Sequence, residues 1–416
     1  MFRKRNGNIF LTLFVLNILM ISTTTNAVER RQKQFRSDQA YFFSPLPYSI
    51  PGVGSGVMFT SLGANLFGSY TDIFAIVITG DATGYAFGFA DLHIVPEVMY
   101  LNYHSRVIDK ASVQSYDSRG MDADKDEFNY YELSQFDERT LDMAVTFFDR
   151  RLELYAGVRT LKTAIKRIRN PEGKIITEFD SPVKSETETP FIGMTVDYTD
   201  DWDDPTVGIR FKTVYESPTR ENRREADFSV LNFSLGAYIP IGSNITWAFN
   251  FQKSDAIVHN EGETDRQKTL NELGLQCPTY DICKGEDQNM INNKIAERRY
   301  GTAKSLGGEA LMRAYPVERF RAAHMNYFST ELRWNIVTDV IPFDFWIWKD
   351  ISTSIQLAFF YEAGSVSDRE EDLNDKIATD KGLGLRMVAK SGFVYRADFA
   401  SGDEGNNISV MVMYPW

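Results

Sequence analysis

The sequence has few of the residues from which catalytic and metal sites are usually built. Among 416 residues there are two cysteines and four histidines, and the histidines are too scattered to suggest a pair of metal ligands. Acidic residues outnumber basic ones by 57 to 45, and the net charge of -12 disfavours a nucleic-acid partner. We therefore expect no catalytic residue, no cofactor, no metal ion and no nucleic acid, and we do not expect an enzyme.

The densest acidic cluster contains five aspartates between positions 197 and 204. Carboxylates of this kind attract calcium, but their spacing lacks the pattern of a calcium-binding loop. We predict a solvated turn at this place.

Long uncharged apolar runs are absent except near the N-terminus. There, Arg3, Lys4 and Arg5 precede an apolar stretch over 9–21, and small polar residues follow up to Ala27. A run of about 13 residues falls short of the ~20 that a membrane anchor helix needs. The layout is typical of a secretory signal peptide, so we predict that residues 1–27 are a signal peptide cleaved after Ala27.

A linker rich in Pro, Gly or Ser is also missing, although a globular chain of this length usually divides into domains. With 43% hydrophobic, 13% aromatic and 25% charged residues, the sequence is too apolar for disorder and too polar for a bundle of membrane helices. One large sheet is the architecture that remains.

What the sequence does contain is alternation with a period of two, from about residue 55 to the end. In the last segment Ile408, Val410, Val412, Tyr414 and Trp416 share one face. The opposite faces carry charged and amide residues even at strand centres, which suits a wet lumen. A secreted β-sandwich also alternates, so this pattern alone does not decide between the two folds.

The connections favour a barrel. Tight turns at 149–151, 240–244 and 390–392 alternate with long polar segments at 108–138, 163–189, 253–326 and 365–381. Periplasmic turns and outer loops of membrane barrels differ in this way. We predict an all-β fold, a transmembrane antiparallel β-barrel over 55–416, preceded by a short periplasmic segment at 28–54 that has no room for a periplasmic domain.

We count about sixteen strands, an even number as such barrels require, if the weakly patterned segment 128–138 is included. The predicted strands cover 56–65, 71–79, 84–93, 97–107, 128–138, 139–148, 152–163, 190–198, 206–216, 227–239, 244–257, 327–336, 352–362, 382–389, 392–400 and 406–416.

Three motifs carry a family resemblance. A glycine pair, Gly307-Gly308, precedes Arg313-Ala314-Tyr315-Pro316, and Glu331-Leu332-Arg333 follows. Further motifs are Phe360-Tyr361-Glu362-Ala363-Gly364 and the turn from Asp197 to Asp201 with Pro205 and Gly208 after it. In this order they resemble the signature of the bacterial surface antigen (BamA/TamA-like) superfamily of outer-membrane assembly and secretion barrels. Ala314, Glu362 and Thr199 depart from that signature, and the POTRA repeats that receive client chains are absent.

The resemblance implies a lumenal latch. The long loop 258–326 is expected to fold into the barrel and to place Arg313 against the strand acid, here Glu362. The expected latch residues are Arg313, Tyr315, Pro316, Glu331, Arg333, Phe360, Glu362 and Gly364. A buried ion pair of this kind either braces the lumen or acts as a switch, and both interpretations stay open here.

The resemblance also implies a weak seam between the first and last strands, which opens toward lipid and pairs with an incoming strand. We place Gly56 and Gly63 in the first strand and Tyr414 and Trp416 in the last, where Pro415 lacks a ladder donor. The alternative is that these glycines only ease barrel curvature and that Pro415 marks a frayed end.

Cys277 and Cys283 are the only cysteines and lie in a polar loop of a chain that we expect to be exported. A disulfide is favoured over free thiols in that setting.

Two functions follow as expectations. The first is an outer-membrane barrel that assists insertion, assembly or translocation of polypeptides, with outer-membrane lipids, unfolded clients and a separate periplasmic protein as partners. The second is a passive pore or structural barrel that has lost client handling. In both cases we expect a monomer in the outer membrane of a Gram-negative-type envelope.

Overall fold

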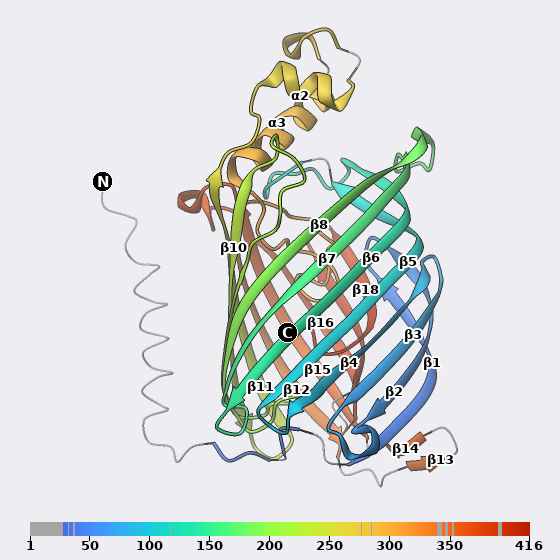
Figure 1. Ribbon diagram of the computed structural model, residues 1–416, viewed down its shortest axis with the longest axis vertical. Coiled ribbons are helices and arrows are strands. Elements are labelled where there is room, and N and C mark those ends of the chain that lie inside the picture. The colour runs from blue at the N-terminus through green and yellow to red at the C-terminus, as the bar shows by residue number, and fades with distance from the viewer. Residues whose placement is uncertain are drawn as a thin grey trace.

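The protein is a closed antiparallel β-barrel (Figure 1). The computed structural model describes residues 28–416 except 32, 36–37, 117, 276, 284, 339–342, 346–347, 352 and 390–392. The predicted signal peptide at 1–27 lies outside the described residues.

Two of the eighteen strands in the sheet, β13 (Phe343–Phe345) and β14 (Trp348–Ile351), are short pieces in the connection between β12 and β15. The other sixteen form the wall. They are β1 (Ala40–Ile50), β2 (Gly54–Ala64), β3 (Asp72–Gly80), β4 (Thr83–Val95), β5 (Met99–Tyr116), β6 (Phe128–Phe147), β7 (Leu152–Arg169), β8 (Ile175–Thr199), β9 (Gly208–Glu216), β10 (Asp227–Ile241), β11 (Ile245–Asn260), β12 (His324–Val337), β15 (Thr353–Ser367), β16 (Ala378–Ala389), β17 (Val394–Gly402) and β18 (Gly405–Val412).

The period of two in the sequence becomes an inside and an outside. In β12, alternate residues from Met325 to Arg333 are buried and face the lumen, while the residues between them are more exposed. The outer face of the wall exposes large apolar side chains, among them Val77, Leu154, Ile192, Trp247, Phe359 and Leu383. Because an exposed apolar ring of this extent is stable only in hydrocarbon, the barrel is built to stand in lipid.

Each wall strand pairs with its neighbours in sequence, and β12 pairs with β15. The ring closes between β1 and β18, where Ser49 and Val410 are the only ladder partners in the described residues. By contrast, all eleven residues of β1 have partners in β2. The closing junction is thus the least paired part of the wall.

The predicted total of sixteen strands is correct, but two of its parts are wrong. Segment 28–54 holds the first wall strand, β1, which we did not expect. Pro45 and Pro47 make it a weak strand signal, because proline is depleted in strands. The barrel wall therefore starts at residue 40 and not at 55. The segments 128–138 and 139–148 are one strand, β6, whose ladder with β7 continues through the charged residues Asp137 and Glu138.

The long connections between β5 and β6, β11 and β12, and β15 and β16 lie at one end of the barrel, and the predicted tight turns at 149–151 and 240–244 lie at the other (Figure 1). The predicted turn at 390–392 lies outside the described residues. The short turns between β1 and β2, β3 and β4, and β17 and β18 share the end of the long connections.

One predicted long connection, at 163–189, is not a loop. Residues 163–169 and 175–189 extend β7 and β8 as a two-stranded ribbon, in which pairs such as Arg167 and Glu178 face each other. Its backbone groups are paired in the ladder, so a polar sequence suffices for a strand there.

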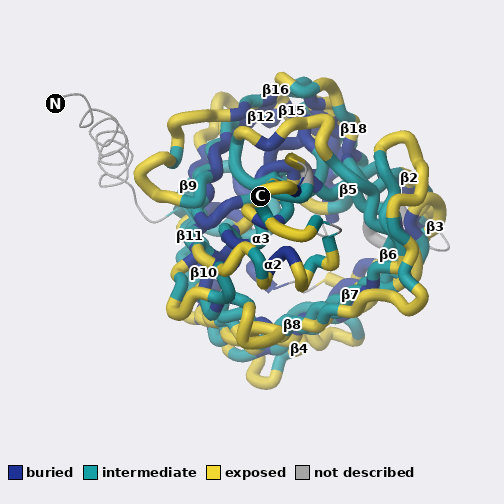
Figure 2. The backbone as a smooth tube through the Cα atoms, turned by 90° about the horizontal axis from the view of Figure 1, so that it is seen from above, coloured by how far each residue is buried: buried dark blue, intermediate teal, exposed yellow. Residues whose placement is uncertain are grey.

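The loop between β11 and β12 carries two helices, α2 (Arg266–Leu273) and α3 (Gly285–Tyr300), which lie over the ring when it is viewed from above (Figure 2). Asp265 caps α2 by accepting a hydrogen bond from the backbone N–H of Lys268 at 2.9 Å. A disulfide joins Cys277 and Cys283 between the helices. The described residues also contain three short 3₁₀ turns: Leu66–Gly68, Tyr280–Ile282 and Glu370–Asp372. Among the described residues, every helix is too short or too polar to cross a membrane.

Candidate functional site: the lumenal loop and the seam

The loop after α3 runs into the lumen and back to β12 as a compact hairpin. Leu306 and Phe320 form a β-bridge across it. Gly307 and Gly308 adopt φ values of 110° and 111°, which a residue with a side chain rarely adopts. The apolar side chains Leu306, Met312, Tyr315 and Phe320 are buried in one cluster with Phe360 of β15. The glycine pair therefore permits the turn, and burial of these side chains holds the hairpin against the wall.

Arg313 stands at the tip of this hairpin and is completely enclosed. Its Nε lies 3.2 Å from Glu362 Oε1, its Nη1 3.0 Å from Asp398 Oδ2, and its Nη2 3.3 Å from Glu331 Oε1. The backbone N–H of Arg313 also donates to Glu362 Oε2 at 2.8 Å. The guanidinium lies over the Phe360 ring, with Cζ 3.4 Å from the centroid.

The acids around Arg313 are shared with three other arginines. Arg386 and Arg333 bind Glu331, with 2.8 Å from Arg386 Nη1 to Glu331 Oε2 and 3.0 Å from Arg333 Nε to the same oxygen. Arg396 pairs with Asp398. Asp380 accepts the backbone N–H of Ala314 at 2.9 Å. We call these eight residues the latch cluster: Arg313, Glu331, Arg333, Glu362, Asp380, Arg386, Arg396 and Asp398.

The latch cluster contains four arginines and four carboxyl groups. All eight side chains are buried. Isolated charges in such a place would cost several kcal/mol each, and the network offsets that cost by pairing them. Removing one member therefore leaves its partners buried and uncompensated.

Small residues on the wall leave the space that the hairpin occupies. A Cβ added to Gly364 would lie 2.6 Å from Leu306 Cδ1 and 3.2 Å from Met312 Sδ. A Cβ added to Gly402 would lie 3.0 Å from Ala314 Cβ and 3.1 Å from Tyr315 Cε2. The hairpin thus docks into a groove of glycines on β15 and β17.

Tyr315 and Pro316 connect the hairpin to the rest of the outer end. The Tyr315 hydroxyl donates to the carbonyl of Thr379 at 3.0 Å. Pro316 packs beside Gly52, and the backbone N–H of Val317 donates to the carbonyl of Pro51 at 3.1 Å. Since Pro51 and Gly52 form the turn between β1 and β2, the loop that carries Arg313 contacts the strand at the seam.

The structure brings the expected latch residues together, and it adds five that sequence reasoning left out. Arg386, Arg396 and Asp398 lie buried on β16 and β17, and they were not assigned to a site from the sequence. Asp380 and Tyr327, whose hydroxyl binds Glu362, had not been singled out. In the sequence, these five residues are marked only as charged or polar positions on the inner face of strands near the motifs.

The predicted seam residues are placed differently. Gly56 and Gly63 lie in β2, away from the closing junction, and Gly56 lets β3 approach because a Cβ there would stand 1.9 Å from the carbonyl oxygen of Thr79. The closing edge belongs to β1. The carbonyl of Pro47 accepts a hydrogen bond from the Tyr395 hydroxyl of β17 at 2.7 Å, so this side of the β1 backbone faces β18. Because proline has no backbone N–H, Pro45 and Pro47 offer β18 no ladder donor.

Tyr414 and Trp416 do not face lipid. The strand ends at Val412, Met413 takes a left-handed φ of 78°, and the chain turns inward. The Tyr414 hydroxyl donates to Asp204 Oδ1 at 2.7 Å, and Arg333 Cζ lies 4.4 Å and 4.8 Å from the Tyr414 and Trp416 rings. The last residues are therefore bound to the latch cluster through Arg333.

Three of the five aspartates in the predicted solvated turn, Asp197, Asp200 and Asp201, are also buried. Asp197 is fully enclosed between Arg30 and Arg210, at 2.7 Å and 3.0 Å. Asp200 accepts the backbone N–H groups of Thr206 and Val207 at 2.8 Å and 3.0 Å. These carboxylates fold a turn at the tight end of the barrel and tie the segment after residue 28 to it.

No family model matches the sequence, and no curated protein matches it. Solved structures are similar in fold. CdiB from Escherichia coli is 11% identical, with 91% of this chain and 68% of that chain covered and a TM-score of 0.52. CdiB from Acinetobacter baumannii is 10% identical, with 90% and 60% covered and a TM-score of 0.50. A structure of BamA from Haemophilus ducreyi lacking POTRA domains 1-3 is 11% identical, with 90% and 68% covered and a TM-score of 0.45.

Identities this low establish similarity of fold. The closed sixteen-stranded ring, its apolar outer face and its charged lumen are the features of barrels that span outer membranes. The chain is accordingly an outer-membrane β-barrel with a fold similar to that of the CdiB barrels.

Proposed function

We propose that the protein assists the insertion, assembly or translocation of polypeptides in the outer membrane, through a seam between β1 and β18 that opens toward lipid. The observation that carries this proposal is the closure of the ring by one ladder pair, Ser49 with Val410, while Tyr41 and Phe42 on the same edge of β1 pair with the short strand β14. An unpaired strand edge attracts another strand, because its N–H and C=O groups need partners. Opening this junction breaks fewer backbone hydrogen bonds than opening any fully paired junction of the wall.

The latch cluster has a defined role in this proposal. It holds the hairpin of Arg313 in the lumen, and the hairpin contacts the turn between β1 and β2. Release of the hairpin would remove support from the outer end of β1. We propose that the latch favours the closed ring and that client binding works against it.

The partners follow from the same mechanism. Client polypeptides would arrive unfolded at the tight end of the barrel, and a separate periplasmic protein would deliver them. Arg30 and Arg31 pair with the aspartate turn at that end, so a delivering protein would meet this segment first. The barrel would act as a monomer, because the proposed exit is its own seam.

A disulfide across the seam tests the mechanism. Ser49→Cys with Val410→Cys joins ladder partners, whose spacing suits a disulfide. Cys277→Ser and Cys283→Ser provide the background. The matched control joins Ser61 and Ala75 across the fully paired β2–β3 junction, on the exposed face.

We expect cells that rely on the seam-locked protein to accumulate unfolded outer-membrane proteins until reductant is added. Cells with the control disulfide should assemble them normally. Normal assembly of outer-membrane proteins while the seam disulfide is fully oxidised would contradict the proposal. The alternative of a passive pore would gain support if planar bilayers then recorded a large and steady conductance from the wild-type protein.

A further inference from the structure

The lumen is only partly filled by the Arg313 hairpin. On the side of β9, β10 and β11 it contains a cavity of about 800 Å³, which residues 302–305 of the loop and Trp416 also line. This volume is within the range of sites that bind small molecules. The latch cluster does not line it.

The charges that line this cavity are unequal, although the protein as a whole is acidic. Five basic and three acidic side chains contribute to the lining. Arg210 is paired with Asp197 at 3.0 Å, Arg159 with Glu216 at 3.3 Å, and Lys253 with Asp255 at 3.2 Å.

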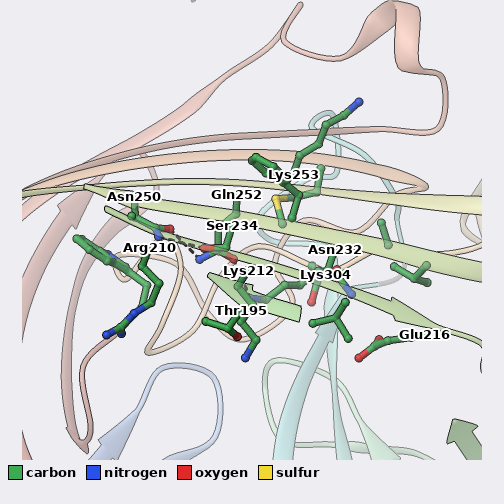
Figure 3. Close-up of a pocket in the computed structure, with 18 of the residues that line it drawn as sticks. Thr195, Arg210, Lys212, Glu216, Asn232, Ser234, Asn250, Gln252, Lys253 and Lys304 are labelled. Atoms are coloured by element: carbon green, nitrogen blue, oxygen red, sulfur yellow. Dashed lines mark hydrogen bonds between the residues drawn. The ribbon is translucent and has the colours of Figure 1, made fainter. Parts of the chain in front are cut away.

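Two ammonium groups are left. Among the described residues, no carboxylate oxygen lies within 4.0 Å of the ammonium nitrogen of Lys212 or Lys304. Both side chains are exposed and line the cavity, Lys212 from β9 of the wall and Lys304 from the loop (Figure 3).

The cavity holds Lys304 in position without neutralising it. Lys304 Nζ donates to Gln252 Oε1 at 2.9 Å, Gln252 Nε2 donates to Asn250 Oδ1 at 2.9 Å, and Asn250 Nδ2 donates to Ser234 Oγ at 3.3 Å. An ammonium group has three donors, so Lys304 keeps two for another partner. The Tyr155 ring lies 5.6 Å from Lys212 Nζ and supplies no acceptor oxygen to it.

We propose that this cavity binds a small solute through an anionic group, a phosphate or a carboxylate, placed between Lys212 and Lys304. Two ammonium groups in a confined space form stronger, charge-assisted hydrogen bonds with such a group than they do on an open surface. The amide and hydroxyl groups of Asn250, Gln252 and Ser234 suit the polar remainder of the solute.

Tryptophan fluorescence of the purified barrel in detergent tests this site, because Trp202 and Trp416 line it. The probes are inorganic phosphate and glucuronate, with chloride and glucose as comparisons at constant ionic strength. We expect a saturable change with one or both anions and none with glucose. A response to phosphate alone identifies a phosphate site, and a response to glucuronate alone identifies a carboxylate site.

The double variant Lys212→Met with Lys304→Met should weaken binding by at least about tenfold. Lys268→Gln, on α2 outside the barrel, is the matched control and should leave binding unchanged. Heat-modifiable gel mobility checks that each variant is folded. If the double variant does not fold, the single variants carry the test, with a loss of about threefold or more expected for each.

Equilibrium dialysis of the wild-type protein with radiolabelled phosphate or glucuronate measures stoichiometry independently of fluorescence. Saturable binding of one anion per chain supports the site. No saturable binding of either anion, equal affinity in the folded lysine variants, or an equal response to chloride would overturn the proposal.

Discussion

Arg313 is the residue on which the lumenal hairpin most depends, because it binds three carboxylates that come from three different strands. Truncating it leaves Glu331, Glu362 and Asp398 buried with fewer counter-charges. Loss of one partner from a buried network costs about 3–5 kcal/mol. We expect Arg313→Ala to release the hairpin while the wall, whose ladders do not involve residue 313, stays folded.

Chymotrypsin added to the purified barrel measures this release, since Phe320 is a buried cleavage site within the hairpin. Arg313→Ala should be cut between residues 301 and 323 much faster than wild type. Arg313→Lys should lie between them, because an ammonium keeps the charge but loses the planar fork. Equal protection of Arg313→Ala and wild type would contradict the role given to Arg313.

A substitution at Gly364 tests how much packing, apart from charge, contributes to holding the hairpin. In Gly364→Val the whole latch cluster remains, but the added atoms overlap Leu306 and Met312, whose atoms stand 2.6 Å and 3.2 Å from the new Cβ. Overpacking of this kind costs about 1–3 kcal/mol. We expect partial release of the hairpin by the same chymotrypsin assay.

Ala363→Val is the control for that variant, because residue 363 is the neighbouring residue on the opposite face of β15. It should leave the hairpin protected. If Gly364→Val were equally protected, the glycine groove would not be needed for docking.

At the scale of elements, Arg298 of α3 holds the two helices together and to the barrel. This buried side chain lies 2.9 Å from Glu225, in the loop between β9 and β10, and 2.7 Å from Glu272 of α2. Burial of Glu225 disfavours its charged form, but hydrogen bonds and charge from Arg298 and Lys294 outweigh burial and lower the pKa of Glu225. The hydrogen bond from Arg298 lowers the pKa of Glu272.

The sign of the pH effect follows from these lowered pKa values. Carboxylates whose pKa is lower in the folded state stabilise it above their usual pKa of 4.5, and that stabilisation is lost as pH falls through the lowered values. We expect the helices to loosen below about pH 4.5 while the barrel persists. Each partly exposed pair contributes only about 1 kcal/mol or less.

A spin label on Asn271→Cys, which is exposed on α2, reports this loosening as faster motion in its resonance spectrum. In the double variant Glu225→Gln with Glu272→Gln, the helices should already be mobile at neutral pH and respond less to acid. An acid response of the same size in that variant would assign the effect to other groups.

On the scale of the whole molecule, the sequence predicted the class of fold because lipid outside and water inside impose alternation on every strand. It predicted the pairing of Arg313 with Glu362 only through a family resemblance. Asp398 and Arg386 were missed as site residues because their place beside Arg313 depends on the register of β15, β16 and β17, which alternation leaves undetermined.

The ends of the ring were predicted least well, for a physical reason. Prolines in β1 and a left-handed residue after β18 are poor signals for strands, and at a closing edge they remove ladder partners. The total of sixteen strands was still correct because the missed strand β1 was offset by the division of β6 into two.

The seam also determines where the ring should begin to unfold. A disulfide between positions 49 and 410 closes almost the whole chain into one loop, whereas one between 61 and 75 closes a short hairpin. By loop-closure entropy the longer loop gains about 3 kcal/mol more. It also protects the junction with the fewest ladder pairs, so we expect the seam disulfide to raise the midpoint of heat-modifiable mobility on non-reducing gels well beyond the control disulfide. Reduction should return both variants to a common midpoint. If instead the two oxidised variants unfolded at the same temperature, the β1–β18 junction would not be the weak point of the wall, and an exit for polypeptides would have to be sought elsewhere in the ring.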